Sequence, residues 1–146
     1  MEMLRKSVND FTAALASKAS VPGGGSASAL AGSLAAALGG MVGELTVGKK
    51  KYAAVEPILC ELLDEAETLR GRLLDCVEKD AAALAPLAKA YAIPKDDPQR
   101  AETLEACLTA AAAPPMEVLE LTGRTVELLR GFADMGSPIA VSDAAV

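Results

Sequence analysis

The chain has 146 residues, 51% of them hydrophobic, which together predict one ordinary globular domain, and its net charge is -6. Its acidity, with only two Phe, two Tyr and no Trp, argues against nucleic acid as a partner. The absence of His excludes Ser-His-Asp and Cys-His catalysis, and three scattered cysteines fit neither a disulfide framework nor a zinc site. Any acid-base catalysis must therefore use carboxylates, Lys, Tyr or Cys. We expect the protein to be in the reducing cytoplasm.

The N-terminal part of the chain has a helical period. Apolar residues step by four, three and four, which predicts a first helix over residues 3–17 on the residues Leu4, Val8, Phe11 and Leu15. A glycine loop follows in the sequence Val21-Pro-Gly-Gly-Gly-Ser26. A second helix is then predicted from Ser26 to about Val47.

The second predicted helix carries small residues every four positions, namely Ser28, Gly32, Ala36 and Gly40. Small side chains at this spacing let another helix approach closely, so we expect this face to support a homodimer. No charge occurs from Ala19 to Gly43, a length that could span a bilayer. The segment is mostly Ala, Gly and Ser, and glycines break its start, so we predict a buried helix and no membrane partner.

The rest of the chain is also predicted to be helical. A third helix is expected to run from Glu56 to about Tyr91 with a kink at Pro86. After a loop over residues 93–98, Asp97 caps a fourth helical region that reaches about Met135, bends at residues 114–115 and ends at residues 136–138. Ser142 is expected to cap one further helix. The predicted class is all-α, a bundle of long helices, two of them kinked by proline.

One carboxylate occupies an apolar position of the third helix. Asp80 falls on a heptad row whose other members are apolar: Leu59, Ala66, Leu73 and Leu87. An apolar setting disfavours the charged form of a carboxylate and suits it to carry protons. The simpler interpretation is a carboxylate paired with Lys or Arg, or one at an exposed edge of the row.

Two further segments are candidate binding sites. Three glycines before a helix can present N–H groups and the positive helix terminus to an anion, or they can be only a flexible turn. Nucleotide binding is poorly supported, because no strand precedes the glycines and the chain has no GxxxxGK[ST] motif. Lys49-Lys50-Lys51-Tyr52 is a basic cluster in an acidic chain. It can stabilise a helix C-terminus, or it can bind a ligand with several carboxylates.

In combination these motifs resemble a known family. The segments are Pro22-Gly-Gly-Gly-Ser26, Thr46-Val-Gly-Lys-Lys-Lys-Tyr52, "CVEKDAAAL", "IPKDDP" and "GSPIAVSDAAV". They occur in this order in the cyclodeaminase domain of formiminotransferase-cyclodeaminase, which has stand-alone bacterial relatives that include methenyltetrahydrofolate cyclohydrolases. The resemblance covers essentially residues 1–146 as one domain and implies an all-helical homodimer that binds folate. In the family the domain continues into further helices after the position that matches Val146. We expect residues 1–146 to lack these C-terminal helices.

The resemblance implies roles for individual residues. Asp80 matches the catalytic aspartate of the family, which favours the proton-carrying interpretation. The remaining matches are to substrate-binding positions: Gly23, Gly24, Gly25 and Ser26 in the glycine loop, Lys49 and Lys50 after the second helix, and Asp143 in the Ser-Asp motif.

The implied reaction is closure of 5-formiminotetrahydrofolate to 5,10-methenyltetrahydrofolate with loss of ammonia, in which Asp80 acts as general acid and base. No metal or other cofactor is expected, because the tetrahydrofolate derivative is the substrate. An alternative is the cyclohydrolase reaction, which opens the methenyl bridge with water to give 10-formyltetrahydrofolate. A non-catalytic folate-binding or structural dimer is the third hypothesis.

Overall fold

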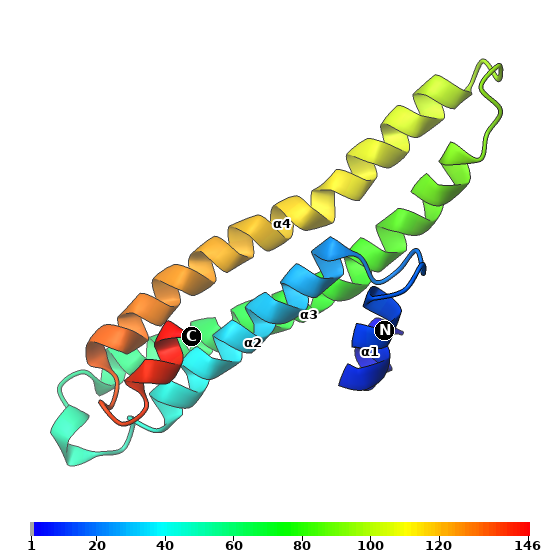
Figure 1. Ribbon diagram of the computed structural model, residues 1–146. Coiled ribbons are helices and arrows are strands. Elements are labelled where there is room, and N and C mark those ends of the chain that lie inside the picture. Colours follow the sequence, from blue (N-terminus) through cyan, green and yellow to red (C-terminus); the bar gives the residue numbers. More distant parts are fainter. Residues whose placement is uncertain (1) are drawn as a thin grey trace. The chain divides into compact units, whose positions relative to one another are not determined.

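The computed structural model describes residues 2–146, and every regular element among them is a helix, so the all-α prediction is confirmed (Figure 1). The three long helices account for most of the chain and four shorter elements flank them. The elements are η1 (Met3–Arg5), α1 (Val8–Leu15), α2 (Gly24–Glu44), η2 (Lys50–Tyr52), α3 (Glu56–Tyr91), α4 (Arg100–Met135) and η3 (Val141–Ala145).

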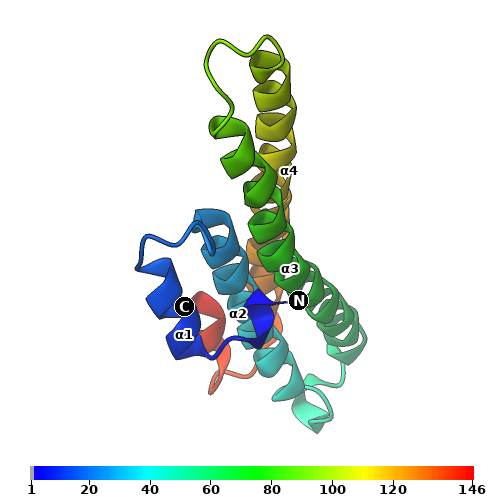
Figure 2. The same ribbon diagram turned by 90° about the vertical axis from the view of Figure 1, so that its right-hand side faces the viewer.

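The elements form two compact units, and each long helix contributes to both. Unit 1 contains the chain up to Leu30 together with Leu74–Leu119, and unit 2 contains Ala31–Leu73 and Glu120–Val146. In unit 1, the second half of α3 and the first half of α4 run antiparallel, side by side, and a loop over residues 92–99 joins them (Figures 1 and 2).

The first predicted helix is wrong in its extent, because the chain is interrupted at Ser7. The side chain of Ser7 accepts a hydrogen bond from the backbone N–H of Asp10 at 3.1 Å, and its hydroxyl donates to the Asp10 carboxylate at 2.6 Å. This reciprocal cap starts α1 at Val8 and separates it from η1. Of the predicted apolar stripe, Phe11 is buried, whereas Val8 is 79% exposed.

Helix α2 begins and ends earlier than predicted, and in unit 2 its small residues accommodate neighbouring helices of the same chain. A Cβ at Gly32 would lie 2.8 Å from Thr122 Cγ2, and one at Gly39 would lie 2.8 Å from Leu129 Cδ2. At Gly32, the close approach of a second helix that the spacing predicts is therefore made by α4 of the same chain. It does not by itself require a second copy.

Helix α3 has the predicted bounds, and α4 ends where expected. Asp97 caps the turn before α4, since its carboxylate accepts the backbone N–H of Gln99 at 2.8 Å, although the helix begins only at Arg100. Both helices continue through their prolines, so the predicted kinks stay predictions. Ser142 does not cap a helix, because η3 already begins at Val141 and Ala140 is its N-cap.

One helix of the described residues, α2, is long and apolar enough to cross a membrane by length and composition. Of its apolar window, 39% is buried within the protein. A core helix of a water-soluble protein meets the same criteria, so the observation is weak evidence for a span.

The N-terminal turn of unit 1 is fixed by a carboxylate of α3. Glu78 Oε1 accepts the backbone N–H of Leu4 at 2.9 Å. Burial raises the pKa of Glu78, but hydrogen bonds from the backbone N–H groups of Leu4, Glu2 and Met3 outweigh it and leave the pKa below its ordinary value. The charged form of Glu78 therefore holds η1 against α3.

We expect Glu78→Ala to lower the free energy of unfolding at pH 7 by about 1 kcal/mol, because η1 loses a charge-assisted acceptor that is only partly shielded from solvent. The folded pKa of Glu78 lies below the unfolded one, so this stabilisation is present above about pH 4.3 and is lost as the pH falls through the folded value. Urea unfolding at pH 7 and at pH 3 measures the difference. Glu61→Ala, an exposed acid of the same helix, is the control; an equal loss at both pH values would contradict the prediction.

Candidate active site

Asp80 lies where the heptad row predicts, in the buried seam of α3 within unit 1. Its residue is 4% exposed, and Val77, one turn before it, is fully buried. The apolar members of the row on its N-terminal side, Leu59, Ala66 and Leu73, are also buried. The placement of Asp80 on an apolar row is thus confirmed. It is not at an exposed edge, and no Lys or Arg of the described residues pairs with it.

The partner of Asp80 is Ser26, in the first turn of α2. The Ser26 backbone N–H donates to Asp80 Oδ2 at 2.7 Å, and its hydroxyl reaches the same oxygen at 2.8 Å. Ser26 is fully buried. The first N–H groups of a helix lack partners within it, so the Asp80 carboxylate occupies part of the anion-binding terminus that the sequence suggested for a ligand.

The two oxygens of Asp80 have different surroundings. Oδ2 accepts both bonds from Ser26, whereas no donor among residues 2–146 reaches Oδ1. Every buried side-chain oxygen and nitrogen of these residues has a hydrogen-bond partner, so Oδ1 must retain contact with solvent. Two hydrogen bonds thus fix Oδ2, whereas none within the described residues fixes Oδ1.

The glycines before Ser26 make unequal contacts. A Cβ at Gly25 would overlap the Asp80 carboxylate and lie 2.6 Å from its Cγ, so only glycine allows the carboxylate this close to the helix. Gly24 has open space around it, and a Cβ at Gly23 would make only ordinary contacts, the nearest at 3.4 Å from Leu84 Cδ1. Gly24 and Gly25 belong to the helix rather than to the predicted loop.

Charged residues beside Asp80 are engaged elsewhere in unit 1. Lys79 Nζ donates to Glu117 Oε2 at 2.8 Å, which raises the pKa of Lys79. Glu78 holds the N-terminal turn. Asp80 is therefore flanked in sequence by charges that have their own partners.

The other predicted binding residues, Lys49, Lys50 and Asp143, lie in unit 2. Lys49 follows the last residue of α2, Glu44, by five positions, beyond the single turn over which a cation stabilises a helix terminus. No basic residue lies in the last turn of α2, whereas Lys50 and Lys51 lie in the last turn of the short helix η2. Both are exposed, and neither forms an ion pair within residues 2–146.

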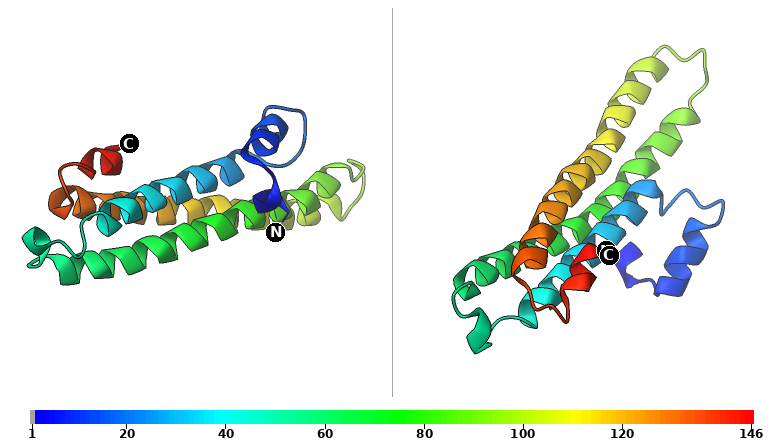
Figure 3. Two further views of the ribbon diagram at one scale, coloured as in Figure 1. Left: turned by 90° about the horizontal axis from the view of Figure 1, so that it is seen from below. Right: turned by 60° about the vertical axis from the view of Figure 1, so that its left-hand side comes forward.

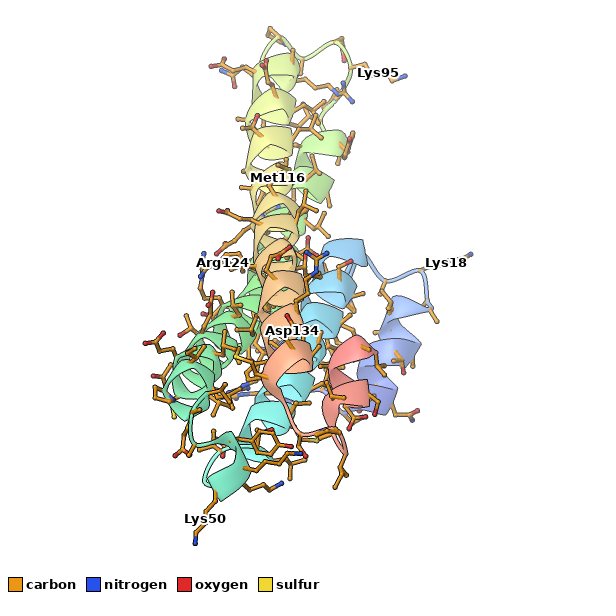
Figure 4. The ribbon with its side chains drawn as sticks, turned by 90° about the vertical axis from the view of Figure 1, so that its left-hand side faces the viewer. Lys18, Lys50, Lys95, Met116, Arg124 and Asp134 are labelled. Carbon is orange, nitrogen blue, oxygen red and sulfur yellow. The ribbon has the colours of Figure 1, made fainter. Side chains whose placement is uncertain are left out.

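The lysines lie in the turn between α2 and α3, at one end of unit 2 (Figure 3). The side chain of Lys50 extends away from the ribbon (Figure 4). Lys51 Nζ lies 5.4 Å from the ring centroid of Tyr52. Asp143 is partly exposed in η3.

The protein is thus of the all-α class. Its candidate acid-base site is a buried carboxylate that two hydrogen bonds hold within unit 1. No group of three or more His, Cys, Asp or Glu in the described residues is arranged to hold a metal ion. The formiminotransferase-cyclodeaminase family matches residues 7–146. The chain belongs to this family, as its motifs indicated.

Three relatives illustrate the match. Methenyltetrahydrofolate cyclohydrolase of Methylorubrum extorquens is 34% identical over 145 residues, which cover 97% of this chain and 70% of that protein. Formimidoyltransferase-cyclodeaminase of Mus musculus is 29% identical over 145 residues, and this chain spans 27% of its length. The crystal structure of formiminotetrahydrofolate cyclodeaminase from Thermotoga maritima superposes with a TM-score of 0.86 at 31% identity, covering 97% of this chain and 68% of that one.

Proposed function

We propose that the protein is an enzyme of folate one-carbon metabolism that converts 5-formiminotetrahydrofolate to 5,10-methenyltetrahydrofolate and ammonia, with Asp80 as general acid and base. The observation that carries the proposal is the asymmetric anchoring of Asp80, whose Oδ2 is held by Ser26 while Oδ1 is left to exchange protons. Similarity to the Thermotoga maritima cyclodeaminase supports the reaction class.

The reaction needs one group that first accepts a proton and then returns it. As N10 attacks the carbon of the formimino group, whose nitrogen is protonated, the N10–C bond forms and Asp80 Oδ1 takes the N10 proton. The resulting carbon is tetrahedral and bears N5, N10 and an amino group. Asp80 then gives its proton to the amino group as the C–N bond breaks, which releases ammonia and leaves the methenyl bridge. The carboxylate begins and ends the cycle ionised.

The cyclohydrolase reaction is the second candidate, and the identity to the Methylorubrum extorquens cyclohydrolase favours it. In that reaction water adds to the methenyl carbon while Asp80 Oδ1 takes one of its protons, and that proton passes to N5 as the C–N5 bond opens. The remaining hydroxyl proton is released to solvent as the formyl C=O bond forms, which balances the positive charge of the methenyl substrate. Both reactions pass through a tetrahedral carbon between N5 and N10, so the same carboxylate serves either one.

Two assays distinguish these reactions. Ammonia release and the appearance of methenyl absorbance from 5-formiminotetrahydrofolate identify the cyclodeaminase. Loss of methenyl absorbance from 5,10-methenyltetrahydrofolate, above the rate without enzyme, identifies the cyclohydrolase. If purified protein turns over neither substrate yet binds folate, the protein is a non-catalytic folate-binding module and the proposed function is wrong.

We expect the double variant Lys49→Ala, Lys50→Ala to raise KM more for polyglutamylated than for monoglutamylated folate. Both lysines are exposed without ion-pair partners in a chain of net charge -6, so they are suited to attract the added carboxylates of a polyglutamate tail. The difference should shrink as salt screens the interaction. Steady-state kinetics with both substrates at low and high ionic strength test this, and equal effects on the two substrates would exclude a role in recognising the tail.

The proposed enzyme is a cytoplasmic homodimer. Helix α2 carries no charge before Glu44, yet in unit 2 it exposes Leu34 and Met41, and Leu45 directly after the helix is exposed as well. Leu34 and Met41 lie two turns apart on one side of the helix, and a helix that is apolar on all sides is typically buried. A second copy supplies the missing cover, which a measurement of molecular mass by light scattering tests.

A further inference from the structure

The Ser26 hydroxyl has two acceptors and one proton. Its oxygen lies 2.8 Å from Asp80 Oδ2 and 3.1 Å from the backbone carbonyl oxygen of Val77. A hydroxyl donates one hydrogen, so it serves one acceptor at a time. Because Ser26 is fully buried, water does not offer a third choice.

Each acceptor has another donor when the hydroxyl turns away. Val77 and Ala81 both lie within α3, where the backbone N–H of residue 81 donates to the carbonyl of residue 77. Asp80 Oδ2 keeps the Ser26 backbone N–H at 2.7 Å. The hydroxyl can therefore move between the two positions without leaving a buried polar atom unpaired, which would be costly.

The charge of Asp80 decides which position is favoured. A hydrogen bond to an ionised carboxylate is about twice as strong as one to a neutral acceptor. When Asp80 is ionised, the hydroxyl gains most by donating to Oδ2. When Oδ1 carries a proton, Oδ2 becomes a neutral carbonyl oxygen and loses this advantage over the carbonyl of Val77.

We propose that Ser26 is a positioning residue whose hydroxyl donates to Asp80 Oδ2 while the carboxylate is charged and turns to the Val77 carbonyl when the carboxylate is protonated. The Ser26 backbone N–H holds the Asp80 side chain in place throughout. The reorientation lets a buried carboxylate change charge without moving away from the substrate. This inference rests on the proposed function and changes the role of Ser26 from contacting substrate to supporting Asp80.

A donor series at position 26 tests the effect on turnover. Ser26→Ala removes the hydroxyl but keeps the N–H, and Ser26→Cys keeps a weak donor. We expect kcat to fall about ten-fold in Ser26→Ala, with KM changed less than about two-fold, and Ser26→Cys to lie between Ser26→Ala and the parent. Ser33→Ala, which removes the hydroxyl of a buried serine of α2 in unit 2, is the control and should keep the parental kcat.

Infrared difference spectra test the reorientation without relying on turnover. The bands of Asp80 are those that differ between the parent and Asp80→Asn, recorded at acid and at alkaline pH. In Ser26→Ala the carboxylate band should shift, while the carbonyl band of the protonated acid should stay in place. Equal shifts of both bands would show a fixed hydrogen bond, and no shift in either would show that the hydroxyl stays on Val77; each result overturns the proposal.

The two measurements separate this inference from the proposed function. If the expected band shifts appear in a protein that turns over neither substrate, the inference about the hydroxyl stands and the proposed function fails. If the protein turns over one of the two substrates but the bands do not shift, the proposed function stands. Ser26 is then not a donor that responds to the charge of Asp80.

Discussion

Asp80→Asn should lower kcat by about 10²–10⁴-fold while the helical content and the free energy of unfolding stay close to those of the parent. The amide removes the oxygen that we propose carries the proton, but it has nearly the same shape as the carboxylate. Its carbonyl oxygen can take the place of Oδ2 and accept both hydrogen bonds of Ser26, which keeps the buried contacts intact. The amide nitrogen then takes the position of Oδ1, the oxygen that we propose exchanges protons in the parent.

Circular dichroism, urea unfolding and steady-state kinetics on both substrates measure this outcome. The matched control is Asp75→Asn, which makes the same chemical change at an exposed position of α3 and should leave all three properties unchanged. If Asp80→Asn turned over substrate at the parental rate, Asp80 would be a structural carboxylate. A large loss of stability would show that the charge itself holds unit 1 together.

The sequence predicts much of this arrangement because a helix repeats regularly. Asp80 shares a heptad row with buried apolar residues, so periodicity predicts its place on this row, although it leaves open whether the carboxylate is buried or lies at an exposed edge. The exact bounds of α3 follow from Pro57 in the first turn and from the loop after Tyr91. The interruption at Ser7 was also predictable, since Ser7 and Asp10 have the spacing of a reciprocal cap, but the apolar stripe through Leu4 and Phe11 concealed it.

The partners of the carboxylates could not be predicted in the same way. Ser26 and Asp80 are separated by 54 positions, and Leu4 and Glu78 by 74, so no local pattern connects them. The glycines before Ser26 suggested a free anion site because an isolated helix terminus has unpaired N–H groups. Only the packing of α2 against α3 in unit 1 shows that a carboxylate of the chain itself takes one of these N–H groups.

The second large effect is expected at Gly25, whose contact with Asp80 gives that glycine a specific purpose. In Gly25→Ala the new Cβ would overlap the Asp80 carboxylate, and the neighbouring atoms cannot yield cheaply because Ser26 holds Oδ2 in place. Either the carboxylate or the first turn of α2 must move. Overpacking of this kind lowers the free energy of unfolding by about 1–3 kcal/mol.

Activity should fall more steeply than stability in Gly25→Ala. A reacting group displaced by about 1 Å costs roughly 100-fold in rate, and the displaced group here is the carboxylate that we propose carries the proton. Gly24→Ala is the stability control, because it adds the same methyl group one residue earlier in the same turn, where nothing lies within 4 Å. Gly71→Ala, also in open space and on α3, is the control for activity.

Urea unfolding and steady-state kinetics on the three alanine variants decide whether the glycines serve a ligand or Asp80. If their role were only to expose N–H groups to substrate, Gly24→Ala and Gly25→Ala would have similar effects, mainly on KM. If Gly25 makes room for the carboxylate, Gly25→Ala alone loses stability and kcat. Parental stability and kcat in Gly25→Ala would show that Asp80 can retreat without cost, and the anchored carboxylate would then not be needed for the reaction.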